Sequence, residues 1–222
     1  MYIIIFILGT IIGSFLNVCI YRIPREESIV FPSSHCTYCN TPLKWYDLIP
    51  VLSYLFLRGK CRYCRGDISP QYPIIELLNG IIYSILFYYL GLSLDFLYFS
   101  IIISILLVIS IIDFYHQIIP DILLVLVIII TVLYRVTVYY IYGIPIYLLD
   151  SLIGFLAAGL LFTIIALVSN GGMGGGDIKL IAILGFILGL KKTILNILLS
   201  FIIGAAVSLF LLTSGKKGRK DA

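Results

Sequence analysis

Long apolar runs alternate with short polar interruptions along most of this chain, and only one interruption is long. Seven runs follow one another, at residues 2–21, 73–90, 96–112, 122–142, 152–168, 178–190 and 193–213. A helix needs about 20 apolar residues to cross the hydrocarbon core of a bilayer, and most of these runs approach that length. We therefore predict an all-α polytopic membrane protein with about seven transmembrane helices. The run at 178–190 is short, so we expect it to be tilted or shielded by its neighbours.

Composition supports this fold class and excludes a soluble globule. Hydrophobic residues make up 61% of the chain and charged residues 12%, which leaves too few polar side chains to cover a water-facing surface. The lipid bilayer is thus the first expected partner. A net charge of +4 would also suit nucleic acid, but the basic residues form two clusters instead of a continuous stripe. We expect no nucleic-acid partner.

The long interruption, residues 22–72, sets the predicted orientation. It holds seven of the 15 basic residues: Arg22, Arg25, Lys44, Arg58, Lys60, Arg62 and Arg65. Because loops rich in Lys and Arg stay in the cytoplasm, we expect the N-terminus outside and the loop inside. The predicted domains are a first transmembrane helix (1–21), a cytoplasmic loop (22–72), a transmembrane core (73–213) and a basic cytoplasmic tail (214–222).

Four of the five cysteines form two Cys-x-x-Cys pairs inside this loop. They are Cys36 with Cys39 and Cys61 with Cys64. Two such pairs supply the four thiolates of a tetrahedral zinc site, and the metal would stabilise a loop too short to bury a core. Two disulfides are the alternative, which the reducing cytoplasm disfavours. Cys19 lies within the first apolar run and is interpreted as a small buried apolar residue.

Two carboxylates stand at the ends of apolar runs. Asp113 follows the run 96–112, and Asp177 follows the glycine-rich segment 170–176. Two crossings separate them, so the predicted topology brings both to the cytoplasmic face. Two neighbouring acids can share a proton and act as general base and general acid, as in aspartic proteases. Acids in membranes also serve as proton relays in transporters or as structural groups, and the residues alone leave these three alternatives open.

A series of motifs along nearly the whole chain closely resembles the type IV prepilin peptidases. In order, they are GSFLNVCIYRIP (13–24), the paired cysteines, WYDLIPVLSY (45–54), RGKC (58–61), YPIIEL (72–77), the Asp113 segment and GGGDIK (174–179). The last motif has the Gly-x-Gly-Asp form that presenilin-like intramembrane aspartic proteases share. Each motif is weak alone, but the ordered set is specific.

This resemblance implies a bifunctional enzyme of the bacterial cytoplasmic (inner) membrane. It would cleave the basic leader of prepilins and pseudopilins after a glycine, on the cytoplasmic side. It would then methylate the new N-terminus with S-adenosylmethionine. Asp113 and Asp177 would be the catalytic pair, and the four cysteines would bind zinc. The alternatives are a proton-coupled transporter that uses the same two acids, and a membrane-bound zinc scaffold. A transporter would need a solute site near the bilayer midplane, whereas both acids map to the cytoplasmic edge.

The other candidate residues have both a functional and a structural interpretation. Gly174 and Gly176 would let the backbone approach an extended substrate, or simply form a flexible loop. Glu76 and Lys179 are candidates for substrate binding or methylation. Dipole complementarity in a first helical turn explains Glu76 nearly as well, and a lysine that snorkels to the membrane surface explains Lys179 nearly as well. No nucleotide-binding glycine motif assigns the methyl-donor site. Relatives continue beyond residue 222, so we expect this chain to be truncated before a final helix.

Overall fold

The computed structural model describes residues 1–145, 148–169 and 172–213, and within them the fold is helical. Six helices are long and apolar enough to cross a membrane. In these described ranges the only β-type pairings are two isolated bridges, both in the cysteine loop. The prediction of an all-α multi-pass membrane protein is confirmed. The expected basic tail, residues 214–222, lies outside the described residues.

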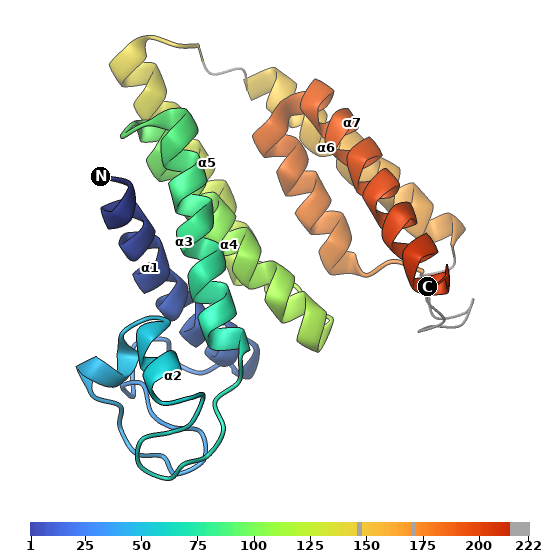
Figure 1. Cartoon of the computed structure of the whole chain (residues 1–222). Coiled ribbons are helices and arrows are strands. Elements are labelled where there is room, and N and C mark those ends of the chain that lie inside the picture. The colour runs from blue at the N-terminus through green and yellow to red at the C-terminus, as the bar shows by residue number, and fades with distance from the viewer. Residues whose placement is uncertain (146–147, 170–171, 214–222) are drawn as a thin grey trace. The chain divides into compact units, whose positions relative to one another are not determined.

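The long helices follow the apolar runs (Figure 1). They are α1 (Tyr2–Arg22), α3 (Gln71–Leu90), α4 (Leu94–His116), α5 (Asp121–Tyr142), α6 (Leu148–Val168) and α7 (Gly175–Thr213). Three short helices, η1 (Ile23–Arg25), η2 (Trp45–Leu48) and α2 (Leu52–Phe56), lie between α1 and α3. Several long helices begin before their apolar run, because helical hydrogen bonding continues into polar residues at the ends.

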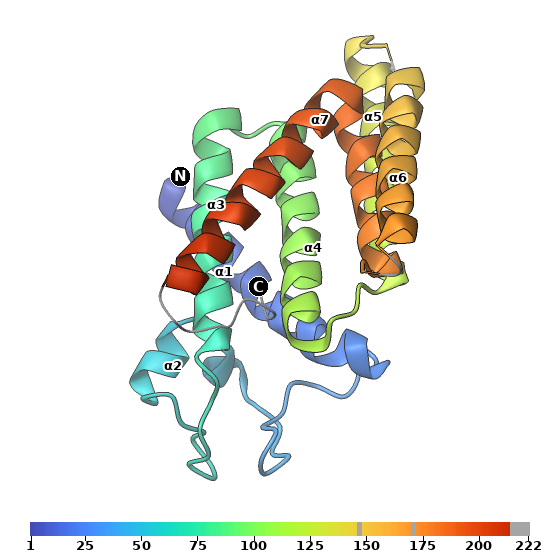
Figure 2. The same cartoon turned by 90° about the vertical axis from the view of Figure 1, so that its right-hand side faces the viewer.

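All seven predicted segments are helical, and the last two of them are continuous. The last two apolar runs form one element, α7, whose backbone leaves the helical conformation at Gly189, with φ 71° and ψ 171°. In both views α7 turns back at this point, between its orange first part and its red second part (Figures 1 and 2). Six helices of membrane-spanning length are therefore described, and the sixth contains both predicted segments.

The chain divides into two compact units, Met1–Tyr134 and Arg135–Ala222. In the first unit α1 packs closely against α3, because glycines replace side chains along the contact. A Cβ atom on Gly9 would lie 2.8 Å from the Cα of Gly80, and one on Gly13 would lie 2.7 Å from the Cα of Glu76. Such small-residue contacts let helix backbones approach one another where lipid offers no hydrophobic driving force.

Buried polar side chains join α1, α3 and α4. Asn79 is fully buried and donates from Nδ2 to the Gly9 carbonyl at 2.7 Å. Its Oδ1 accepts from the Ser104 hydroxyl at 3.2 Å, and that hydroxyl also lies 3.1 Å from the Tyr83 hydroxyl. A fully satisfied network of this kind fixes the register of the helices that hold the loop and Asp113.

In the second unit α6 packs along α7. Gly154 and Gly185 lie at the contact, where a Cβ atom on either would overlap the backbone of the other. The break at Gly189 removes helical partners from nearby backbone groups, and two side chains replace them. Arg135 Nη2 donates to the carbonyls of Phe186 and Ile187 at 2.9 and 3.1 Å.

The second replacement comes from Asp150, whose Oδ1 accepts the N–H of Leu190 at 3.4 Å. Arg135 also donates to the Ser151 hydroxyl, so the guanidinium has partners on both α6 and α7. These contacts pair backbone groups that the break in the helix leaves without helical partners.

Candidate functional site

The cysteine loop contains two knuckles with the same backbone fold, residues 35–42 and 60–67. In each, the first cysteine donates its N–H to the carbonyl of the fifth residue after it: Cys36 to Thr41 at 3.0 Å, Cys61 to Gly66 at 2.8 Å. Each also has a left-handed residue directly after its second cysteine, Asn40 with φ 53° and Arg65 with φ 62°. Both knuckles read Cys-x-Tyr-Cys, a local repeat that the sequence analysis did not use.

The four thiols fit one metal site. The Sγ atoms of Cys36, Cys39, Cys61 and Cys64 all lie within 4.8 Å of one another, and those of Cys36 and Cys64 are 3.8 Å apart. Tetrahedral zinc with Zn–S bonds of about 2.3 Å would separate its sulfurs by about 3.8 Å. The four are free thiols in a single cluster, not two bonded pairs, so the arrangement favours zinc over the disulfide alternative. Zinc here would stabilise the loop.

The thiols of this cluster differ in acidity. The Thr41 hydroxyl, 3.2 Å from the Cys39 sulfur, together with the Thr41 backbone lowers the pKa of Cys39 to about 6. At Cys64 the Gly66 N–H favours the thiolate, but desolvation and the neighbouring thiols outweigh it and raise the pKa to about 12. The backbone N–H of Cys64 also lowers the pKa of Cys61. Cys39 and Cys61 thus ionise more readily than Cys64. A divalent cation bound there would stabilise all four as thiolates.

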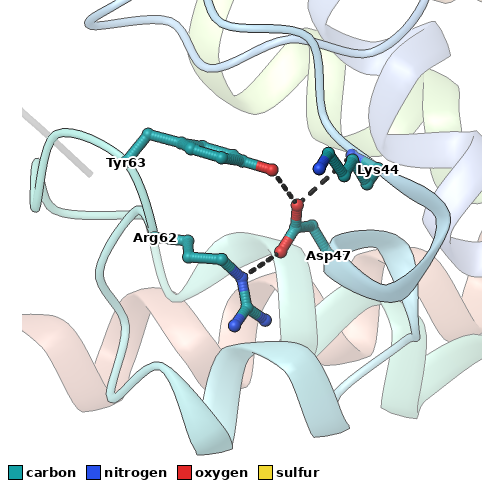
Figure 3. Close-up of polar contacts among 4 residues, drawn as sticks. All are labelled: Lys44, Asp47, Arg62 and Tyr63. Carbon is teal, nitrogen blue, oxygen red and sulfur yellow. Dashed lines mark hydrogen bonds and ion pairs between the residues drawn. The ribbon is translucent and has the colours of Figure 1, made fainter.

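Asp47 connects the segment after the first knuckle with the second knuckle (Figure 3). Its Oδ1 accepts from Arg62 Nε at 2.7 Å, and its Oδ2 accepts from the Tyr63 hydroxyl at 2.9 Å and the Lys44 N–H at 3.2 Å. The carboxylate is 3% exposed, and these donors outweigh desolvation and hold its pKa below the usual range. Asp47 therefore braces the two halves of the metal site against each other.

Asp113 lies in the last turn of α4 and is exposed. The helix ends three residues later, at His116, where Gln117 adopts a left-handed conformation and donates its N–H to the Asp113 carbonyl at 2.8 Å. This cap fixes the backbone of Asp113 and leaves the carboxylate at the end of a membrane-length helix. A carboxylate in that position can reach both water and a peptide at the membrane surface.

Asp177 lies in the first turn of α7, which begins at Gly175, and is half-buried. Its carboxylate folds back over Gly174, where a Cβ atom would lie 3.2 Å from Oδ2. Gly176 is half-buried and Lys179 is exposed in the same part of the helix. Asp113 and Asp177 belong to different compact units, so their pairing remains a prediction.

Comparison with known proteins covers nearly the whole chain. The bacterial peptidase A24 N-terminal domain matches residues 7–90, and the type IV leader peptidase family matches residues 100–209. A prepilin leader peptidase/N-methyltransferase of Bacillus subtilis (strain 168) is 34% identical over 98% of this chain and 86% of its own length. The chain belongs to the type IV leader peptidase family.

Other relatives in this family carry the same name. Those of Klebsiella pneumoniae and Neisseria gonorrhoeae are 34% and 31% identical. The matches cover 83% and 97% of this chain, and 84% and 83% of the relatives. No solved structure gives a significant match. The names of these relatives lend no support to the transporter alternative.

In this member of the leader peptidase family, Glu76 is a buried contact between helix and loop. Its spacing from Pro73 predicts a first helical turn, but α3 begins at Gln71, so Glu76 lies in the second turn and dipole complementarity does not explain it. Glu76 is 7% exposed, and its Oε2 accepts the Val51 N–H at 2.7 Å. Val51 has φ 60° and ψ −49°, a strained conformation for a β-branched residue. Glu76 holds this strained segment against α3.

Arg22 has a role that sequence reasoning missed. It is 5% exposed, and its guanidinium donates to the carbonyls of Ser28 and Pro32 at 2.9 and 2.8 Å. It therefore ties the start of the cysteine loop to the end of α1, whereas a basic residue at a helix end usually suggests contact with lipid. This role could not be predicted from the sequence, because the two carbonyls come near Arg22 only in the folded loop.

Proposed function

We infer that this chain cleaves the leader of prepilins or pseudopilins and methylates the new N-terminus. The observation that carries this inference is the match along both halves of the chain to relatives named prepilin leader peptidase/N-methyltransferase. Asp113 and Asp177 are the proposed catalytic carboxylates of an intramembrane aspartic endopeptidase. Cleavage is expected after a glycine of the leader.

The order of helices supports the pairing of these two acids. Asp113 lies in the last turn of α4 and Asp177 in the first turn of α7, and two helices of membrane-spanning length, α5 and α6, lie between them. An even number of crossings returns a chain to the face it left. With the basic loop retained in the cytoplasm, that face is cytoplasmic and the N-terminus is outside. The bacterial cytoplasmic (inner) membrane is the proposed location.

The proposed hydrolysis uses the two carboxyl groups in opposite protonation states. The ionised carboxylate takes a proton from water as the water oxygen forms a bond to the scissile carbonyl carbon. The protonated carboxyl gives its proton to the amide nitrogen as the C–N bond breaks. The leader leaves with a new carboxyl group and the pilin with a neutral amine. Two close acids suit this cycle because like charges prevent both from ionising together.

Other groups would support these steps. Gly174 and Gly176, beside Asp177, would let an extended substrate approach the backbone, and Lys179 would orient a substrate or the carboxylates. The four cysteines would hold structural zinc and so keep the loop folded. S-adenosylmethionine would be the methyl donor for the new amine.

The test is the product of a prepilin with a basic leader, incubated with the full chain in lipid nanodiscs and analysed by mass spectrometry. We expect a new N-terminus directly after the leader glycine, and one added methyl group when S-adenosylmethionine is present. Asp177→Asn should abolish cutting, whereas Asp121→Asn, an acid in the first turn of α5, should retain it. If the Bacillus subtilis relative cuts this prepilin and the present chain leaves it intact, the inference is wrong.

A further inference from the structure

A cavity of about 620 Å³ lies within the first compact unit, between the cytoplasmic-loop ends of α1 and α3 and the cysteine loop. The last residues of α4 complete its wall. Both views show the loop gathered at the foot of these helices (Figures 1 and 2). The volume is typical of sites for small molecules and cofactors, which combine apolar walls with a few convergent polar groups.

One wall of the cavity carries a buried acceptor without a donor. Asn17 is 3% exposed, and its Nδ2 donates to the carbonyls of Tyr72 and Gly13 at 3.1 and 3.3 Å. In the part of the chain that the structure describes, no hydrogen-bond donor reaches Asn17 Oδ1. Buried polar atoms are normally paired, so this oxygen indicates an occupant that donates a hydrogen bond.

The second polar group is the buried carboxylate of Glu76. It lines the same cavity, and its partners, the Val51 N–H and the Ser14 hydroxyl, are both neutral. The basic residues Arg22 and Arg25, which also line the cavity, donate to backbone carbonyls instead. An amide oxygen and a carboxylate together select a ligand with a cationic or N–H-rich end, because both groups only accept in this arrangement.

Aromatic side chains supply the rest of the recognition surface. Tyr21, Tyr54 and Tyr72 line the cavity and come from α1, the loop and α3. Tyrosine rings can stack on a nucleobase and can face a cation. The walls thus offer separate places for a flat heterocycle and for a positively charged group.

We propose that this cavity binds S-adenosylmethionine, with the cationic methionine part against Glu76 and Asn17 and the adenine among the tyrosines. The inference rests on the proposed function, which requires a methyl donor but does not locate it. The sulfonium and ammonium groups meet the two acceptors, and the adenosine matches the aromatic wall. The assignment also explains why a carboxylate and an amide are buried where lipid or loop packing would favour apolar groups.

The position of the cavity suits the order of the two reactions. Tyr115 and His116 line it, and Asp113 lies less than one helical turn before His116. An amine released at Asp113 would therefore form close to the cavity wall. Its nitrogen lone pair would form the new N–CH₃ bond as the S–CH₃ bond breaks. The bonding electrons stay on sulfur, so a neutral amine gives a methylammonium product and neutral S-adenosylhomocysteine.

The test is equilibrium dialysis of radiolabelled S-adenosylmethionine against the full chain in lipid nanodiscs. Glu76→Gln and Asn17→Leu should each weaken binding at least tenfold. The matched controls are Glu27→Gln, an exposed acid in the same loop, and Asn196→Leu, a half-buried carboxamide of α7 that does not line the cavity. Both controls should bind as the unaltered chain does. Unchanged binding in the two cavity variants, or equal weakening in the controls, overturns the proposal.

A second measurement needs no substitution and covers variants that fail to fold. An 8-azido analogue of S-adenosylmethionine, photolysed on the unaltered chain, should label peptides from α1, the cysteine loop or α3. Labelling confined to α6 or α7 overturns the proposal. Failure of the proposed function is distinguishable from failure here. If the chain binds the donor but cuts no prepilin, the proposed function is contradicted. If the chain cuts and methylates, but both cavity variants bind the donor as the unaltered chain does, the proposed binding site is contradicted.

Discussion

At the scale of single residues, the acids of this chain are distinguished by their surroundings. Asp47 is surrounded by three donors and braces the metal site, and Glu76 is buried in the cavity wall. Asp113 and Asp177 lie at helix ends where a carboxylate can meet water. The sequence shows the same side-chain chemistry at all four positions. The contacts of Asp47 assign it a structural role, whereas the catalytic role of Asp113 and Asp177 is proposed from the family motifs.

We predict that Asp47→Asn speeds zinc release roughly two- to fivefold at neutral pH, because an ion pair with a half-exposed arginine contributes modestly. Transfer of zinc to a chromophoric chelator measures the rate. The pKa of Asp47 is lowered in the folded chain. The contribution of Asp47 to the stability of the folded loop is therefore complete above its ordinary pKa of about 4, and is lost only as pH falls through its lowered pKa in the folded chain.

The lowered pKa of Asp47 also predicts how pH affects the comparison between the unaltered chain and Asp47→Asn. Between about pH 8 and 5 the ratio of their zinc release rates should stay constant, since Asp47 remains ionised throughout. A difference that disappears within this interval would contradict the role given to the carboxylate.

At the scale of elements, the helices pack through glycines and through side chains that hydrogen-bond to backbone groups where a helix is interrupted. The apolar runs predicted where the helices lie because the pattern depends only on local sequence. They did not predict the partners of Arg22, Arg135 or Asn17, because these contacts arise between segments distant in the chain. The short apolar run 178–190 indicated that a helix ends near Gly189. The hydrogen bonds from the backbone around Gly189 to Arg135 and Asp150 could not be predicted from the sequence.

We predict that Gly13→Ala destabilises the first unit by about 1–3 kcal/mol, because the new methyl group would overlap the Glu76 backbone. Unfolding by increasing amounts of denaturing detergent, followed by circular dichroism, measures the change. Gly204→Ala is the control, since a Cβ atom there meets no atom within 4 Å. Equal effects of the two substitutions would rule out close helix packing as the reason for Gly13.

A second prediction at this scale concerns the turn in α7. Arg135→Gln should destabilise the second unit by about 1–3 kcal/mol, because the shorter side chain leaves the carbonyls of Phe186 and Ile187 unpaired. The same detergent titration tests it, with the exposed Lys191→Gln as control. If Arg135→Gln unfolds at the detergent concentration of the unaltered chain, its carbonyl contacts do not stabilise the turn.

At the scale of the whole molecule, a loop with a four-cysteine cluster and a set of membrane helices serve one family function. The order of motifs made the family recognisable, and the cysteine spacing made the cluster predictable because both knuckles are local folds. The cavity beside the loop was not predictable, since its walls come from α1, α3, the loop and α4. The match to the N-terminal domain ends at residue 90, the end of α3, and the match to the leader peptidase family begins at residue 100, within α4.

We predict one zinc ion per chain, measured by elemental analysis of the purified protein. Removal with a strong chelator should open the loop to limited proteolysis, because metal binding supplies much of its folding free energy, about 10–16 kcal/mol in small zinc domains. Cys61→Ser should have the same effect, whereas Cys19→Ser should retain the metal, because Cys19 lies in α1 outside the cluster. A loop equally resistant without metal would show that zinc does not stabilise it.

The central claim is that Asp113 and Asp177 act as one catalytic pair, and a double-mutant cycle on prepilin cleavage tests it most directly. Asp113→Asn and Asp177→Asn should each lower the rate at least about a thousandfold. The double variant should be no slower, since groups that act as a unit are not additive. Asp95→Asn, at the opposite end of α4, should cut normally. Near-normal cutting in either single variant, or losses that multiply in the double variant, would contradict the account.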